Sequence, residues 1–304
     1  MSLEKSYKLL RGGVKLELAV LNSKLRRLPP GVPHSLFLCL TYRCQLRCTH
    51  CRYRQPAYRT AGGSGMPPAL ALLLLKRAAA AGIPRVIMFG GEPTLYGNLE
   101  KVVREASALG LFTEMDTNGL LLSTRKLSAL SAAGLSALRI SLHSASAAAH
   151  NRLQDSGSFP LVRGAVKRAL ESGFLVYLSS CLSGENAGAA NIARLSALGK
   201  AWGAHGIRFL AHVSDKKPSG AGSPGIAAQI RKKGLETYAR TCFEKAGAGR
   251  CAAQEGRTVF VGPDGAVRAC PYAVKVLGRA GGGFPLGRRV SSRAGKMLPC
   301  ARRS

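Results

Sequence analysis

Residues 40–51 read LTYRCQLRCTHC. The three cysteines of this stretch, at Cys-x3-Cys-x2-Cys spacing, are Cys44, Cys48 and Cys51. The apolar run 35–40 just before them predicts a buried strand, so the cysteines fall in the loop that leaves its C-terminal end. Three thiolates can ligate three irons of a 4Fe–4S cluster and leave the fourth iron open to a ligand. Two alternatives are a zinc site with His50 as fourth ligand and a set of buried free thiols.

The composition limits the class of protein. The chain has 304 residues and nine cysteines, and its formal net charge is +30. Such a charge favours nucleic acid, anionic lipid headgroups or phosphorylated substrates as partners, although a general surface bias without a specific partner explains it equally well. The sequence has no apolar run long enough to cross a membrane and no signal-peptide pattern at its start. Many cysteines without an export signal predict metal binding in a reducing cytoplasm, with peripheral contact at the inner membrane surface as an option.

From residue 35 onward, short apolar runs alternate with helical stretches. Strands are expected over 35–41, 85–89, 111–117, 137–142, 174–181 and 207–213. Helices are expected over 68–81, 98–109, 123–133, 161–172 and 187–202. Four of the helices are followed by a glycine, as a helix C-terminus commonly requires. This alternation predicts an α/β fold with a parallel sheet.

Polar motifs follow several of these strands. Gly90, Gly91, Glu92 and Pro93 come after the second strand, where the glycines allow close backbone approach to a ligand and Glu92 offers an acceptor to a cationic group. Thr117 and Asn118 follow the third strand, and Ser141 and His143 end the fourth. In parallel α/β folds the carboxyl ends of the strands carry the chemistry. His143 is either a substrate-facing acid/base or a capping residue, and we favour the second role.

The cysteine loop and the Gly-Gly-Glu-Pro motif together resemble the radical S-adenosylmethionine (radical SAM) superfamily. The resemblance implies a partial (β/α)6 TIM-like barrel over residues 34–213. It also implies a 4Fe–4S cluster on the three cysteines that binds and cleaves S-adenosylmethionine, and a reducing partner such as flavodoxin or ferredoxin. The residues implied to contact S-adenosylmethionine are Gly90, Gly91, Glu92, Pro93, Thr117, Asn118 and Ser141. Gln154 stands where this family usually has an arginine, and Arg152 is the nearby substitute.

The C-terminal part, 241–304, contains four further cysteines. These are Cys242, Cys251, Cys270 and Cys300. Alternating residues around Pro263-Asp264-Gly265 predict a β-hairpin before Cys270. The pattern resembles the twitch form of the SPASM/twitch subgroup, a small hairpin-and-helix domain that holds an auxiliary iron–sulfur cluster. A four-cysteine zinc site is the alternative. Cys39 and Cys181 lie within strand-like runs and are expected in the core.

Two further segments complete the expected domain organisation. Residues 1–33 form a basic amphipathic arm, which either rests on a membrane surface or an acidic partner or packs across the end of the barrel; we favour packing. Residues 214–240 form a linker with a short basic helix over 226–240 that covers the barrel mouth. The chain end after residue 288 is a basic tail.

The resemblance predicts a radical SAM oxidoreductase or maturase that abstracts hydrogen from a small molecule or a peptide. Other substrate classes that the charge allows are an anionic lipid or lipid-linked sugar and RNA. A non-catalytic metal-binding interaction protein is the alternative from a different class.

Overall fold

The computed structural model describes part of the chain, and every structural statement below concerns that part. The described residues are 32–54, 65–184, 186–211, 223–241, 252–253, 255–273 and 275–280. The expected N-terminal arm, apart from residues 32–33, and the basic tail lie outside them, as do Cys242, Cys251 and Cys300. In the described ranges, none of the helices combines the length and the apolar character that a membrane span needs.

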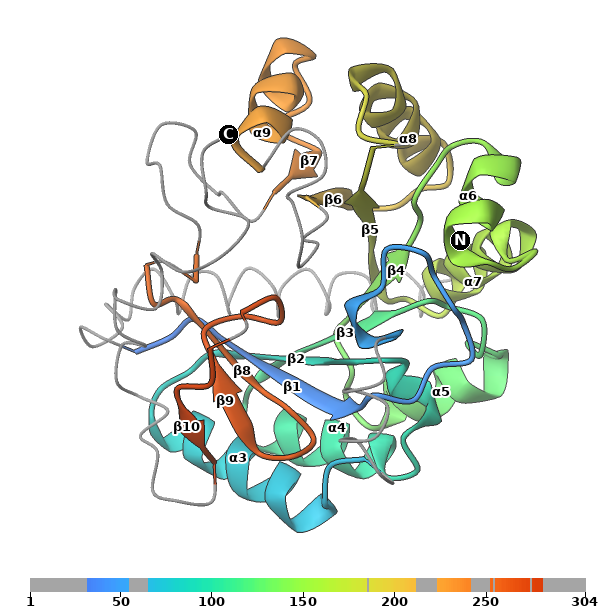
Figure 1. The fold of residues 1–304 in the computed structure, drawn as a ribbon. Coiled ribbons are helices and arrows are strands. Elements are labelled where there is room, and N and C mark those ends of the chain that lie inside the picture. Colours follow the sequence, from blue (N-terminus) through green and yellow to red (C-terminus); the bar gives the residue numbers. More distant parts are fainter. Residues whose placement is uncertain are drawn as a thin grey trace.

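Strands and helices alternate through most of the chain (Figure 1). The strands are β1 (Ser35–Thr41), β2 (Arg85–Gly90), β3 (Phe112–Thr117), β4 (Ala137–Ser141), β5 (Leu175–Leu182), β6 (Gly206–Ala211), β7 (Ala239–Arg240), β8 (Thr258–Val261), β9 (Ala266–Arg268) and β10 (Gly278–Arg279). The α-helices are α3 (Pro68–Ala80), α4 (Leu99–Ala108), α5 (Thr124–Ala132), α6 (Ala147–Gln154), α7 (Phe159–Glu171), α8 (Ala189–Ala201) and α9 (Ser223–Lys232). Two short 3-10 helices are η1 (Arg52–Arg54) and η2 (Pro93–Leu95).

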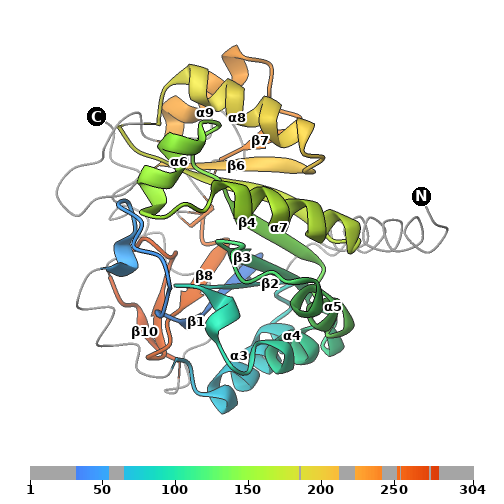
Figure 2. The same ribbon diagram turned by 90° about the vertical axis from the view of Figure 1, so that its right-hand side faces the viewer.

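All strands join one curved sheet in the order β10-β9-β8-β1-β2-β3-β4-β5-β6-β7. Strands β1 to β6 are mutually parallel and adjacent in chain order, and the helices lie along the outer side of the curve (Figures 1 and 2). Each parallel step needs a crossover, which the helices supply. The expected α/β fold with a six-stranded, partial TIM-like barrel is therefore confirmed.

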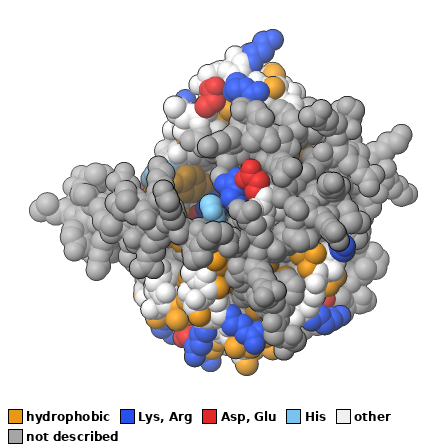
Figure 3. Space-filling model, turned by 90° about the vertical axis from the view of Figure 1, so that its left-hand side faces the viewer, with side chains coloured by type: hydrophobic (Ala, Val, Ile, Leu, Met, Phe, Trp, Pro, Cys, Tyr) orange, Lys and Arg blue, Asp and Glu red, His pale blue; other side chains and the backbone are white. Residues whose placement is uncertain are grey.

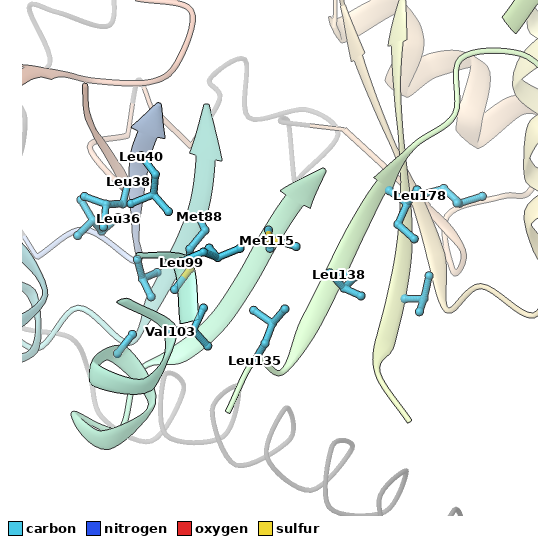
Figure 4. Packing of buried hydrophobic residues seen from close by; sticks show 14 of the residues in the cluster. Leu36, Leu38, Leu40, Met88, Leu99, Val103, Met115, Leu135, Leu138 and Leu178 are labelled. Carbon is cyan, nitrogen blue, oxygen red and sulfur yellow. The ribbon is translucent and has the colours of Figure 1, made fainter. Parts of the chain in front are cut away.

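The outer face of the sheet forms the main hydrophobic core (Figure 4). Alternate strand residues such as Leu38, Met88 and Met115 are fully buried and belong to one cluster with Leu99 and Val103 of α4. Because side chains on a strand alternate between faces, the intervening residues line the inner face, which we call the lumen.

The lumen has two chemically different halves. On the side of β8, β1 and β2 it is aromatic: the Phe89 ring makes edge contacts with Phe37, Tyr53 and Phe260 at centroid distances of 6.1, 5.9 and 6.2 Å. On β3, β4 and β6 the corresponding positions carry the charged residues Glu114, Asp116, Arg139 and Arg208, and those of β5 are polar. The cysteine loop thus lies at the end of a barrel whose interior is aromatic beside β8, β1 and β2 and polar or charged beside β3 to β6.

Two expectations about the elements were wrong, and one strand pairing was not expected. The helix predicted over 226–240 spans only Ser223–Lys232, because Gly234 takes a positive φ of 61° and ends it. Its Ile226 and Ile230 are buried in the main core, so α9 packs on the outside of the barrel instead of covering the mouth. Residues 147–154 form α6, a helix that was not among those expected from the sequence. The hairpin around residues 263–265 is confirmed, and its β8 also pairs in parallel with β1.

Candidate active site at the carboxyl ends of the strands

The cysteine loop begins where β1 ends, and the backbone after β2 holds it in place. The N–H of Gly91 donates to Thr41 O at 2.7 Å, and the N–H of Glu92 donates to Arg43 O at 2.8 Å. A Cβ atom at Gly91 would lie 2.3 Å from Arg43 O, and one at Gly90 would lie 2.2 Å from Thr41 O. The two glycines are therefore needed for this close approach of backbone to backbone.

The three loop cysteines are half-buried and share one electrostatic environment. Burial, together with the charge of Cys51, raises the pKa of Cys44 to about 11 and that of Cys48 to about 12. Thiols with raised pKa values become thiolates when a metal centre supplies compensating positive charge. Within the described ranges, no three His, Cys, Asp or Glu side chains converge on a single ion.

Hydrogen-bond donors surround the sulfur of Cys44. The N–H of Leu46 lies 3.4 Å from this Sγ, and Asn118 Nδ2 lies 3.8 Å from it. Asn118 Oδ1 accepts from Gln45 Nε2 at 3.2 Å and from the N–H of Leu120 at 3.0 Å, so the amide is fixed in orientation. Hydrogen bonds to ligand sulfurs tune the potential of an iron–sulfur cluster. Asn118 thus contacts Cys44 directly, a contact not included in its expected role toward S-adenosylmethionine.

Glu92 is fully buried and ties the end of β2 to the end of β3. Its Oε1 accepts from the hydroxyls of Thr94 at 2.6 Å and Thr117 at 2.8 Å and from the N–H of Thr94 at 3.1 Å. Its Oε2 accepts from the N–H of Asn118 at 2.8 Å. Burial raises the pKa of Glu92, and these hydrogen bonds oppose that rise. A carboxylate has about four acceptor positions, so only Oε2 keeps room for an amino group.

The remaining residues expected near S-adenosylmethionine are Ser141, Gln154 and Arg152. Ser141 shares a sheet row with Ser179 of β5 on the lumen face. Gln154 is 1% exposed: its Oε1 accepts from Ser158 Oγ at 2.6 Å, whereas its buried Nε2 has no hydrogen-bond partner in the described part of the chain. A buried amide donor of this kind suits a bound ligand. Arg152 is exposed on α6, and no hydrogen bond joins it to the loop within the described residues.

Three histidines form a row from the cysteine loop to α6. The rings of His50 and His143 have centroids 4.3 Å apart, and those of His143 and His150 are 5.8 Å apart. His143 Nδ1 accepts the N–H of Cys181, and His150 Nδ1 accepts the N–H of His143, each at 3.2 Å. Burial lowers the pKa of His143 well below its usual value and that of His150 to about 4. Both rings are therefore neutral at pH 7, and His143 accepts from a backbone N–H, while the N-cap of the helix that follows is Ser146.

The C-terminal segment is attached directly behind the cysteine loop. Arg52 Nη1 donates to Tyr272 O at 2.7 Å, and the Tyr53 hydroxyl donates to Pro271 O at 3.1 Å. Cys270, which precedes these residues, is half-buried. Cys39 is fully buried, as expected. Cys181 is half-buried, but it faces the lumen, where the charge of Cys51 acts on it and burial raises its pKa to about 12.

Comparison with known proteins identifies the class. The family model of the radical SAM superfamily matches residues 38–195, which is just over half of the chain, and the chain belongs to this superfamily. The cofactors of the family are a 4Fe–4S cluster and S-adenosylmethionine. The three neighbouring cysteines, the donors to Cys44 and the buried Nε2 of Gln154 fit these cofactors.

Particular relatives narrow the comparison. The PqqA peptide cyclase of Rhodopseudomonas palustris is 35% identical over 123 residues, 40% of this chain and 32% of that protein. The GTP 3',8-cyclase of Mycolicibacterium smegmatis is 37% identical over 141 residues, 45% of this chain and 39% of that protein. The matches thus span about a third of the length of these curated relatives.

Among solved structures, Streptococcus suis SuiB bound to the precursor peptide SuiA has a TM-score of 0.70 at 15% identity. The match covers 92% of this chain and 70% of SuiB. The anSMEcpe structure with bound AdoMet and the Cp18Cys peptide has a TM-score of 0.65 at 16% identity and covers 90% and 84% of the two chains. At these identities the likeness concerns the fold.

Several residues around the site were not identified from the sequence. They are Gln45 beside Asn118, His150 and Ser158 in the histidine row, and Arg208 and Tyr272 in the lumen. Gln45 lies inside the quoted cysteine loop, so its proximity to the site was readable although its contacts were not. No local pattern marks Arg208 or Tyr272, because their partners lie far away in the chain.

Proposed function

We propose that this protein cleaves S-adenosylmethionine reductively and abstracts a hydrogen atom from a peptide substrate in a maturation step. The observation that carries the proposal is the cysteine loop, held by Gly91 and Glu92 against the ends of β2 and β3, with Asn118 directed at the sulfur of Cys44. The cluster and S-adenosylmethionine, when bound, supply the radical chemistry. The chain supplies their position and the exclusion of water.

The roles of individual residues follow from their places. Cys44, Cys48 and Cys51 hold the cluster, while Asn118 and the N–H of Leu46 stabilise negative charge on the first of these sulfurs. The remaining acceptor position of Glu92 Oε2 receives the amino group of S-adenosylmethionine. Gln154 Nε2 donates to its carboxylate in place of the missing arginine, a role for which Arg152, exposed on α6, is less suited.

A second iron–sulfur cluster on Cys270 and the other C-terminal cysteines belongs to the proposal. Its support is the attachment of residues 271–272 to η1, which places Cys270 near the first cluster loop. The aromatic half of the lumen fills the space between this segment, β1 and β2. A small electron donor of the flavodoxin or ferredoxin type would reduce the first cluster. We retain residues 34–213 as the barrel and 241–304 as the auxiliary-cluster region.

A peptide is favoured as substrate over other molecules because of the relatives. PqqA peptide cyclase and the peptide-bound SuiB and anSMEcpe structures all carry a peptide in their names or titles. GTP 3',8-cyclase, whose name specifies a nucleotide, keeps small molecules as the second substrate class.

The test is formation of 5'-deoxyadenosine by the anaerobically reconstituted, reduced full chain. We expect S-adenosylmethionine to be consumed by the wild type and not by the Cys44/Cys48/Cys51→Ala variant, which controls for chemical cleavage by the reductant. A Cys39→Ala variant, which alters a buried thiol outside the loop, controls for general loss of cysteine. If the wild type makes no more 5'-deoxyadenosine than the triple variant, with or without peptides, the protein is a metal-binding protein without this activity.

A further inference from the structure

Five charged side chains form a continuous chain of ion pairs across the lumen. Arg85 Nη1 contacts Glu114 Oε1 at 3.4 Å, and Arg139 bridges Glu114 Oε2 at 2.9 Å and Asp116 Oδ1 at 3.1 Å. Arg208 Nη2 contacts Asp116 Oδ2 at 2.8 Å. Three guanidinium groups thus meet two carboxylates, and all four carboxylate oxygens are engaged. This group of five carries one positive charge in excess.

The two ends of this chain of ion pairs, Arg85 (the lower end) and Arg208 (the upper end), differ in how completely their N–H groups are hydrogen-bonded. At the lower end, the Arg85 Nε and Nη2 atoms both donate to Ser35 Oγ, at 3.0 and 2.7 Å. At the upper end, Arg208 uses Nη2 for Asp116 and, at 3.4 Å, for Ser179 Oγ. Its Nε is buried and has no hydrogen-bond partner in the described residues. Of the three guanidinium groups, Arg208 is therefore the one with a buried donor left unused.

The position of Arg208 places it beside the proposed site. The sheet register aligns Ser141 of β4 with Ser179 of β5, and Ser179 with Arg208 of β6. This row lies at the carboxyl end of β4, in the middle of β5 and at the third residue of β6, and on β4 it is one same-face position beyond Arg139. The hydroxyl of Tyr272 lies in the same space, since the charges of Cys181, Arg208 and Asp116 act on it. The Arg208 side chain is 19% exposed, so a molecule in the lumen can reach it.

We propose that Arg208 binds a carboxylate of the substrate in the lumen next to the radical site. This inference rests on the proposed function, because it concerns the substrate of that same reaction. A guanidinium group binds a carboxylate through two parallel hydrogen bonds, and Arg208 has Nε available for one of them. One carboxylate also neutralises the single excess charge, whereas a dianionic phosphate would overcompensate it. The carboxylate comes from an acidic side chain or from a peptide C-terminus.

The experiment measures binding of small probes to the full, reconstituted chain with S-adenosylmethionine present, by calorimetry under anaerobic conditions. The probes are N-acetylglutamate N-methylamide for an acidic side chain, N-acetylalanine for a C-terminus, the glutamine analogue of the first, and methyl phosphate. We expect a carboxylate probe to bind and the glutamine analogue and methyl phosphate to bind more weakly. Which of the two carboxylates binds better identifies the source of the group.

Variants locate the interaction. Arg208→Gln should weaken carboxylate binding about tenfold or more, the usual effect of losing a charge-assisted hydrogen bond. Arg208→Lys should recover part of the loss. Arg85→Gln is the matched control: it removes the same charge from the same ion-pair chain, but at the saturated lower end, and should leave binding nearly unchanged. Circular dichroism and iron content confirm that each variant is folded and loaded.

Three outcomes overturn the inference: no carboxylate binding by the wild type, equal binding of the acid and its amide, or equal losses in Arg208→Gln and Arg85→Gln. Equal losses would mean that the probe responds only to the total positive charge of the ion-pair chain and does not contact Arg208 itself. Formation of 5'-deoxyadenosine is measured on the same preparations. If 5'-deoxyadenosine forms but no carboxylate probe binds, the inference about Arg208 is wrong and the proposed radical activity stands. If no 5'-deoxyadenosine forms, the proposed activity is wrong, and the calorimetry still decides whether Arg208 binds a carboxylate.

Discussion

Replacement of Gly91 by alanine should displace the start of the cysteine loop. The new Cβ would lie 2.3 Å from Arg43 O and 2.6 Å from Tyr42 O, so the backbone must retreat by about 0.7 Å to reach even the 3.0 Å limit of real contacts. That movement disrupts the hydrogen bonds from Gly91 N to Thr41 O and from Glu92 N to Arg43 O. Two weakened backbone hydrogen bonds plus overpacking cost about 2–4 kcal/mol of unfolding free energy.

Gly97→Ala is the control, because Gly97 is exposed and an added Cβ there meets no atom within 4 Å. Its unfolding free energy should stay the same or rise by up to about 1 kcal/mol, since alanine reduces the entropy of the unfolded chain. Urea unfolding of both variants gives the difference, and iron per chain after reconstitution reports on the loop. The argument is refuted if both variants unfold within about 0.5 kcal/mol of each other and bind equal iron.

Three other predictions follow from the site. His150 stays neutral in the fold, with a pKa of about 4, but takes up a proton near pH 6.5 when unfolded; stability should therefore fall by about 3 kcal/mol as the pH drops from 6.5 to 4. His150→Gln keeps an acceptor for the N–H of His143 and should reduce this dependence of the unfolding free energy on pH, measured by urea titrations at several pH values. An unchanged pH dependence would show that other groups cause it. Asn118→Ala removes a donor to Cys44 Sγ and should shift the cluster potential to a more negative value in redox titration, at a cost of about 1–2 kcal/mol in stability; an unshifted potential would show that the 3.8 Å contact is weak. In the Cys44/Cys48/Cys51→Ala variant, about four irons per chain should remain, and adding Cys270→Ala should remove them. If the triple variant contains zinc and no iron, and Cys270→Ala removes that zinc, the C-terminal cysteines form a zinc site.

Much of the barrel could be predicted from the sequence because its signals are local. The strand expected over 35–41 has those bounds, and the others agree within one or two residues, since each apolar run is closed by glycine or polar residues. The cysteine spacing and the Gly90–Gly91 pair likewise lie within short windows. The helix α6 was missed because its sequence, AAAHNRLQ, carries only a weak apolar stripe, although Ser146 caps it by accepting from the N–H of Ala149.

The contacts that were missed link residues far apart in the chain. Arg208 pairs with Asp116 across 92 residues, and nothing near either residue indicates the other. The pairing of β8 with β1 uses backbone groups, which leave no trace in side-chain patterns. The helix predicted over 226–240 extended too far because Gly234, where the backbone takes a positive φ and turns, was not recognised as its end.

The pairing of β1 with β8 has a consequence for synthesis of the protein. Strand β1 is made early, yet its second neighbour, Thr258–Val261, leaves the ribosome more than 200 residues later, about 10–45 s at ordinary rates of translation. Until then one edge of β1 lacks its hydrogen bonds, and such an edge invites pairing with other chains. The segment at residues 271–272 that supports the cysteine loop arrives later still. Iron insertion should accordingly follow release of the finished chain, and a chaperone that covers β1 in the meantime would raise the yield of active protein.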